Sequence, residues 1–236
     1  MSETTVVCLG DSITRGQVSV PYVDLLRSRF PEHRIVNAGV NYDLAYNALG
    51  RLEQVIAERP DVVTVLLGTN DANATLSERN RRMMTRTRKL PTRPTAQWFR
   101  ENLEAIVTRL GAETGARIAL LGLPVIGEEL DSEPLRRAGE YSGIVREVAA
   151  AHDCAYLPLH ERQVEYLRAT GHRPGTRYRD GMLLSSTAAT QHFVLRREFD
   201  AISAGRGLLL STDTVHQNST GARMIAELIA EFVEVG

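Results

Sequence analysis

Short apolar runs and longer amphipathic stretches alternate along this chain. The apolar runs predict buried strands at residues 6–9, 34–37, 61–67, 117–123 and 154–157. Between and after them, apolar side chains recur at helical spacing over residues 22–30, 44–58, 96–110, 133–151 and 219–235. This alternation predicts a single α/β domain over residues 1–236, with a parallel sheet and helices on both of its faces.

Two long segments interrupt the alternation, at residues 72–95 and 166–207. Each is longer than a connection within a compact domain requires, and such segments commonly act as lids or binding loops. Within the second segment, a helix is expected over residues 191–203. Because parallel α/β sheets bind their ligands beyond the carboxyl ends of the strands, we expect both segments to form a cap over that edge.

Composition and charge narrow the class of protein. The 236 residues carry a net charge of -1, which argues against a general affinity for nucleic acid or for an anionic membrane. The amino terminus lacks the pattern of a secretory leader, and no apolar run approaches the roughly 18 residues that insert stably across a membrane. Cys8 and Cys154 lie in apolar runs and are interpreted as buried free thiols, which favours a cytoplasmic location.

The first predicted strand is followed by Gly10, Asp11 and Ser12. A serine at a strand-to-helix junction lies where unpaired backbone N–H groups and the helix dipole favour negative charge. That position suits a nucleophile whose substrate develops an oxyanion. Serine is also a common helix cap, so this segment alone leaves both interpretations of Ser12 open.

The next two strands end in Gly39 and in the sequence Gly68-Thr69-Asn70-Asp71. The N–H of a glycine can approach a ligand closely, and an asparagine amide donates a hydrogen bond without charge. Together with the N–H of Ser12, Gly39 and Asn70 predict a three-donor oxyanion hole. Each is separately an ordinary turn residue, so the prediction depends on their common place at one edge of the sheet.

A base for Ser12 is expected in Asp213-Thr214-Val215-His216, just before the closing helix. A histidine base needs a carboxylate that fixes its tautomer, and the spacing of Asp213 and His216 allows one short turn to hold both. The other five of the six histidines lack such a context.

Taken in order, these four blocks resemble those of the SGNH (GDSL) hydrolases, and the resemblance extends over almost the whole chain. It implies a flavodoxin-like, three-layer α/β/α sandwich around a five-stranded parallel sheet. It also implies that Ser12 is the nucleophile, that His216 and Asp213 complete the triad, and that Ser12, Gly39 and Asn70 form the oxyanion hole. No metal or organic cofactor is implied. We therefore predict a serine hydrolase that cleaves a small carboxylic ester or thioester through an acyl-enzyme on Ser12.

Some residues depart from the family's pattern or fall outside it. Tyr42 is bulky where the family often has a small turn residue, which favours short acyl groups, and Thr214 replaces the commoner glycine. Arginines of the stretch 79–93, with Arg79 and Arg82 as candidates, are expected either to meet an anionic substrate or to lie in a solvated loop.

Three other functions are alternatives to ester hydrolysis. Acyl transfer to a sugar or natural-product hydroxyl uses the same triad and differs only in the acceptor. A metal-dependent phosphoesterase needs more carboxylate and imidazole ligands than the predicted strand ends offer. A non-catalytic binding protein is disfavoured because every position of the triad is filled.

Overall fold

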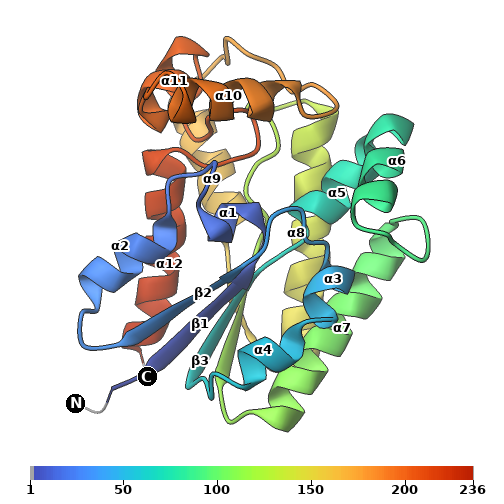
Figure 1. Ribbon diagram of the computed structural model, residues 1–236, viewed down its shortest axis with the longest axis vertical. Coiled ribbons are helices and arrows are strands. Elements are labelled where there is room, and N and C mark those ends of the chain that lie inside the picture. Colours follow the sequence, from blue (N-terminus) through green and yellow to red (C-terminus); the bar gives the residue numbers. More distant parts are fainter. Residues whose placement is uncertain (1–2, 236) are drawn as a thin grey trace.

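The computed structural model describes residues 3–235, and at its centre is one parallel sheet. Its five strands lie in the order β2-β1-β3-β4-β5. They are β1 (Thr5–Gly10), β2 (Arg34–Gly39), β3 (Val62–Leu66), β4 (Arg117–Leu121) and β5 (Ala155–Leu157). Figure 1 shows the sheet between two layers of helices. The predicted three-layer α/β/α sandwich is therefore confirmed.

The alternation of side chains along β1 divides the core into two halves. Val7 and Leu9 belong to the cluster beneath α7 (Ala96–Glu113) and α8 (Glu133–Ala151). Val6 and Cys8 belong to the cluster beneath α2 (Tyr22–Arg29) and α12 (Ser219–Glu234). All four side chains are fully buried, which explains why the strand reads as an uninterrupted apolar run.

The helix predicted over residues 44–58 is broken, so that prediction is wrong at its centre. It forms α3 (Ala45–Leu49) and α4 (Leu52–Ile56), and the backbone leaves the helical region at Arg51 (φ -120°, ψ 17°). The apolar stripe continues through the break because both short helices pack against α7.

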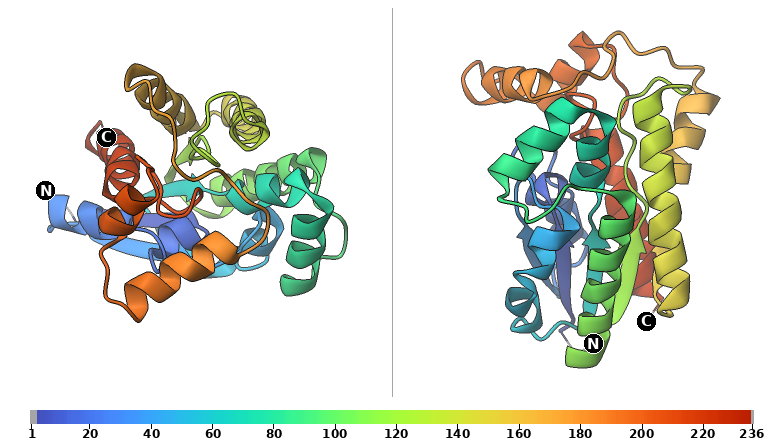
Figure 2. Two further views of the ribbon diagram at one scale, coloured as in Figure 1. Left: turned by 90° about the horizontal axis from the view of Figure 1, so that it is seen from above. Right: turned by 90° about the vertical axis from the view of Figure 1, so that its right-hand side faces the viewer.

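The two long segments are largely helical. The first contains most of α5 (Thr69–Leu76) and all of α6 (Glu78–Thr87). A helix that the sequence did not predict, α9 (Leu159–Ala169), takes in residues 166–169 of the second segment. The helix expected over 191–203 is wrong, since α10 (Leu183–Phe193) and α11 (Phe199–Gly205) are separate and Arg196 between them has a positive φ of 54°. Helices α10 and α11 both lie beyond the carboxyl ends of the strands (Figures 1 and 2).

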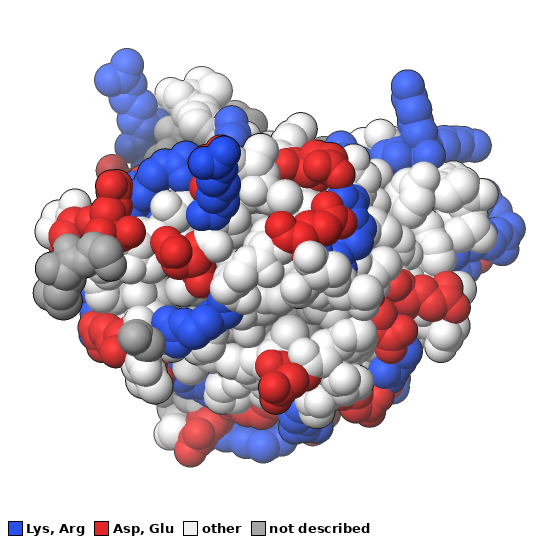
Figure 3. All heavy atoms as spheres, turned by 90° about the horizontal axis from the view of Figure 1, so that it is seen from below, with Lys and Arg blue, Asp and Glu red and all other residues white. Residues whose placement is uncertain are grey.

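The opposite end of the molecule carries acidic and basic side chains side by side (Figure 3). Many surface charges are paired, as where Arg109 contacts Glu53 and Glu113. Within residues 3–235, no helix combines the length and the apolar character that crossing a membrane requires.

Candidate active site

Ser12 begins the short helix α1 (Ser12–Arg15) directly after β1. The cap of this helix is Asp11, whose Oδ1 accepts a hydrogen bond from Ile13 N at 2.9 Å. The Ser12 side chain instead meets His216, with Oγ 2.9 Å from Nε2. Ser12 is only 8% exposed, so this contact is shielded from bulk solvent. The capping interpretation of Ser12 therefore does not hold.

A tight turn before α12 holds Asp213 and His216 together. Oδ2 of Asp213 lies 2.7 Å from Nδ1 of His216, and Oδ1 accepts backbone hydrogen bonds from Val215 at 3.1 Å and His216 at 2.8 Å. Thr214 takes the left-handed conformation (φ 76°) that glycine adopts more readily. Its carbonyl accepts a hydrogen bond from Gly127 N at 2.7 Å, which anchors the turn.

The ionisation of this pair is shifted in opposite directions. Burial by itself would lower the pKa of His216, but the charge of Asp213, the hydrogen bond between them and the charge of Asp11 raise it above its ordinary value. Burial would likewise raise the pKa of Asp213, but the charge of His216 and the hydrogen bonds from the turn lower it. The carboxylate is thus suited to stabilise an imidazolium at Nε2.

The predicted oxyanion donors lie at neighbouring strand ends, where Gly10 of β1 is in register with Gly39 of β2 and Leu66 of β3. The N–H of Ser12 is in the first turn of α1, where no intrahelical acceptor exists. Gly39 N donates to Asn37 Oδ1 at 3.0 Å. Asn70 Nδ2 donates to Asp43 O at 3.0 Å and to Asp11 Oδ2 at 3.2 Å. The donors of Gly39 and Asn70 thus already have acceptors within the protein, unlike an N–H in the first turn of a helix.

Gly39 has a second, steric reason to be glycine. A Cβ atom at this position would lie 2.3 Å from Arg15 N and 2.8 Å from Asp11 O. The backbone around α1 therefore lies so close to the end of β2 that a side chain at residue 39 would displace it.

Two hollows meet at Ser12 and His216. The smaller is a cavity of about 50 Å³ that reaches Asn70 and is otherwise lined mainly by Tyr42, Met83, Met84, Tyr178, Met182 and Leu184. The larger, about 130 Å³, lies on the α10 side and includes Asn41, Ser185 and Ser186. Residues of both long segments thus line the space at Ser12.

Asn80 joins the two long segments above the cavity, a role that the sequence did not reveal. It is 1% exposed; its Nδ2 donates to Tyr178 Oη at 2.7 Å and to Asn73 Oδ1 at 2.8 Å, and its Oδ1 accepts from Gly181 N at 2.9 Å. The only available signal was an uncharged polar residue within an arginine-rich run.

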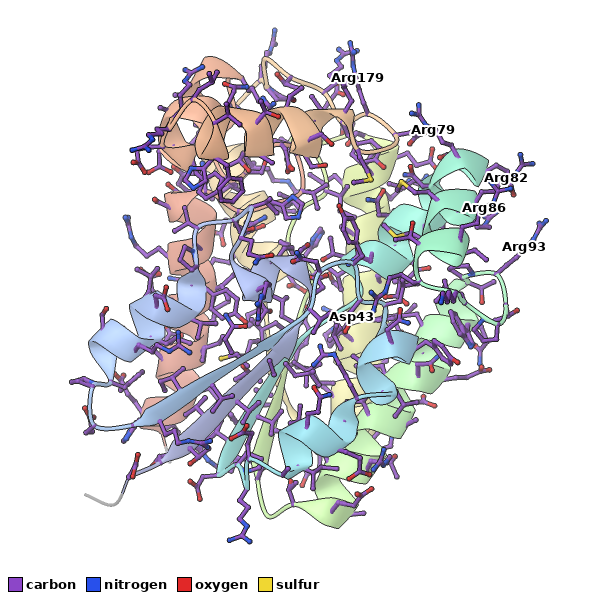
Figure 4. The ribbon with its side chains drawn as sticks, viewed as in Figure 1. Asp43, Arg79, Arg82, Arg86, Arg93 and Arg179 are labelled. Carbon is purple, nitrogen blue, oxygen red and sulfur yellow. The ribbon has the colours of Figure 1, made fainter. Side chains whose placement is uncertain are left out.

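The candidate substrate residues are placed differently. Tyr42 lines both hollows, with a positive φ of 64°. The guanidinium of Arg79 lies beside Gly181 at the rim. Asn80 and Met84 form the buried face of α6, and Arg82, midway between them, is on the opposite face. The prediction that Arg82 contacts the substrate is therefore corrected. Figure 4 shows Arg82, Arg86 and Arg93 pointing outward.

Across residues 3–235, no group of three or more His, Cys, Asp or Glu side chains is arranged to hold a metal ion.

Known proteins resemble this chain in fold. An acetyl xylan esterase is 21% identical, with a TM-score of 0.69 and coverage of 97% of this chain and 99% of that one. A lipase/acylhydrolase from Enterococcus faecalis is 24% identical, with a TM-score of 0.63 and coverage of 98% and 95%. An acetylxylan esterase from Geobacillus stearothermophilus is 18% identical, with a TM-score of 0.67 and coverage of 98% and 94%. A comparison with curated protein sequences gives no match.

The sequence itself gives the family. It matches the model of the GDSL-like Lipase/Acylhydrolase family over residues 8–224, a span that contains all four motif blocks. The chain belongs to this family and is a carboxylic ester hydrolase, as its motifs predicted.

Proposed function

We propose that Ser12 attacks the acyl carbon of the ester and carries the acyl group as an acyl-enzyme. The observation that carries this proposal is the continuous chain of contacts from Ser12 Oγ to His216 Nε2 (2.9 Å) and from His216 Nδ1 to Asp213 Oδ2 (2.7 Å). His216 takes the Ser12 proton during attack and returns it to the departing alcohol. Water, activated by the same imidazole, then releases the acid.

The oxyanion of each tetrahedral intermediate is bound by Ser12 N, Gly39 N and Asn70 Nδ2 in this proposal. The substrate oxygen replaces the longer of the two Asn70 contacts, the one to Asp11 at 3.2 Å, while Asp43 O keeps the amide in place. Gly39 N likewise has to share its proton with, or turn away from, Asn37 Oδ1. Removing one such donor typically costs roughly 10²–10³ in kcat.

The substrate is proposed to be a short-acyl ester of a polar alcohol. A cavity of about 50 Å³ beside Asn70 holds only a few water-sized groups, which suits an acyl group such as acetyl. The larger hollow, with Asn41, Ser185 and Ser186, suits a hydroxyl-bearing leaving group. Two structural neighbours described as acetyl xylan esterases act on a substrate of this kind.

The segments 72–95 and 166–207 serve as the cap in this proposal, joined by Asn80 above Ser12. The cap limits acyl length, while Arg79 at its rim favours leaving groups that carry a negative charge. The outward position of Arg82 leaves it no part in this.

Labelling by a fluorophosphonate probe tests the nucleophile, because the probe reacts with activated serines. We expect one adduct on Ser12, lost in Ser12→Ala and in His216→Ala. Equal labelling of the folded Ser12→Ala variant would refute the proposal.

A further inference from the structure

Asp43, in the loop between β2 and α3, is bound by two arginines from distant parts of the chain. Its Oδ2 accepts a hydrogen bond from Arg51 Nε at 2.6 Å, and its Oδ1 accepts one from Arg88 Nη2. The Asp43 side chain is fully buried, whereas those of Arg51 and Arg88 are 13% and 26% exposed. A carboxylate is stable at this depth only when charge-assisted hydrogen bonds replace its water.

The same residue holds Asn70 in place. The backbone oxygen of Asp43 accepts the 3.0 Å hydrogen bond from Asn70 Nδ2, so the orientation of that amide depends on the position of this loop. Arg51 ties the loop to the end of β1 through its Nη2, which donates to Gly10 O at 3.0 Å. Arg88 ties it to the cap, because this residue ends α6.

Arg88 differs from the other arginines of its segment in meeting a buried carboxylate: Arg81 is equally exposed, at 26%, but pairs with the half-exposed Glu78. Arg82, Arg86 and Arg93 are exposed and point outward, whereas Asp43 lies inward, near the carboxyl ends of the strands (Figure 4). Burial raises the pKa of Asp43, and the two arginines oppose that rise. Loss of Arg88 would leave Oδ1 without this donor in a buried site, and the loop would have to move to recover one.

We propose that Arg88 is a positioning residue for ester hydrolysis: through Asp43 it holds the Asn70 amide where it can meet the oxyanion. This proposal rests on the proposed role of Asn70 as an oxyanion donor. The segment 72–95 would then have two roles: it covers the cavity, and Arg88 at the end of α6 keeps the Asn70 amide in place.

A double-mutant cycle between Arg88 and Asn70 provides the test, with an acetyl ester as substrate. Arg88→Gln should lower kcat about tenfold with little change in KM, because a misplaced donor matters most in the transition state. Asn70→Ala should lower kcat by roughly 10²–10³. Adding Arg88→Gln to Asn70→Ala should then cost almost nothing, since the group that Arg88 positions is already absent.

Controls separate positioning from a general loss of structure. Arg86→Gln, an exposed arginine two residues away, should leave kcat unchanged, and Arg88→Lys should recover part of the lost rate. Thermal unfolding is measured for every variant, and Arg88→Lys replaces Arg88→Gln in the cycle if the latter does not fold.

Two outcomes would overturn the inference while leaving the oxyanion hole intact: full activity of Arg88→Gln, or an equal loss with and without Asn70. A normal kcat in Asn70→Ala would instead remove the proposed role of Asn70, and the inference with it.

Discussion

The carboxyl edge of the sheet and the proposed cap, formed by residues 72–95 and 166–207, are built by different means. At the edge, Ser12 and Asn70 lie two and four residues beyond the ends of neighbouring parallel strands, so the sheet topology brings them together. In the cap, Asn80 and Gly181 meet although about a hundred residues separate them, and no shared sheet fixes their register.

This difference has a chemical counterpart. The edge contains buried polar groups that are paired with one another, including the Ser12, His216 and Asp213 chain and the carboxylate of Asp43. The two segments line the space at Ser12 with Met83 and Met84 of α6 and with Tyr178, Met182 and Ser185, and the opposite face of α6 is rich in arginine. We therefore expect substitutions at the edge to alter the rate of reaction with every ester, and substitutions in the cap to alter the choice among esters.

Loss of the nucleophile should have the largest effect. Ser12→Ala should reduce ester hydrolysis by on the order of 10³ or more, with an unchanged circular dichroism spectrum, since the side chain is small and does not cap α1. His216→Ala should be about as damaging because the two groups act as a unit. Steady-state hydrolysis of nitrophenyl acetate measures both. Retained turnover in either folded variant would contradict the edge's proposed role.

The pH dependence should reveal the coupling within the edge. His216 must be neutral to accept the Ser12 proton, and its pKa is raised, so kcat/KM should increase with pH through a value above the ordinary pKa of histidine, about 6.5. Asp213→Asn should cost less activity than loss of Ser12, since the base remains. It should also move the rising limb to lower pH, because the charge of Asp213 then no longer opposes the effect of burial on the pKa of His216, although that of Asp11 remains. An unchanged limb would show that Asp213 does not set this pKa.

The sequence predicted the edge better than the cap for a physical reason. Short apolar runs located all five strands, and the residues after them then had to meet at one edge. Hydrophobic spacing could not reveal the break at Arg51, because the apolar stripe passes through it while the side chain turns to a buried carboxylate. Nor could it pair Asn80 with Gly181, which depends on two helical segments folding against each other.

The positive charge of the segment 79–93 likewise did not show which of its arginines are exposed and which contact a buried group. The sequence favours a solvated loop or a contact for anions, with Arg79 and Arg82 as candidates, and gives no sign that Arg88 is different. The structure separates them, since Arg88 lies against a buried carboxylate whereas Arg82 is 74% exposed. Position on the helix, and not composition, distinguishes them.

Removing the hydrogen bonds by which Asn80 joins the two segments of the proposed cap should change selectivity more than rate. Asn80→Ala leaves Gly181 N and Tyr178 Oη without this partner. The free energy of unfolding should therefore fall by about 1–3 kcal/mol. A looser cavity should raise the ratio of butyrate to acetate hydrolysis several-fold. Asn102→Ala is the matched control, because that largely buried amide donates to Trp98 O within its own helix and so joins no separate segments. An equal change of the ratio in both variants would mean that stability alone is responsible.

The smallest effect is expected from the charge at the rim. Arg79→Gln should slow esters with an anionic leaving group roughly two- to fivefold relative to neutral ones, which corresponds to about 0.5–1 kcal/mol for an exposed ionic contact. Arg82→Gln should leave that preference unchanged, because its guanidinium is on the outer face of α6. Salt at about 0.5 M should reproduce the effect of Arg79→Gln through screening, and should add little to the variant itself. The measurement is the ratio of kcat/KM for a matched pair of anionic and neutral acetyl esters. If both variants lower the ratio equally, the anion responds to the summed charge of α6; if neither does, the cap selects by shape alone.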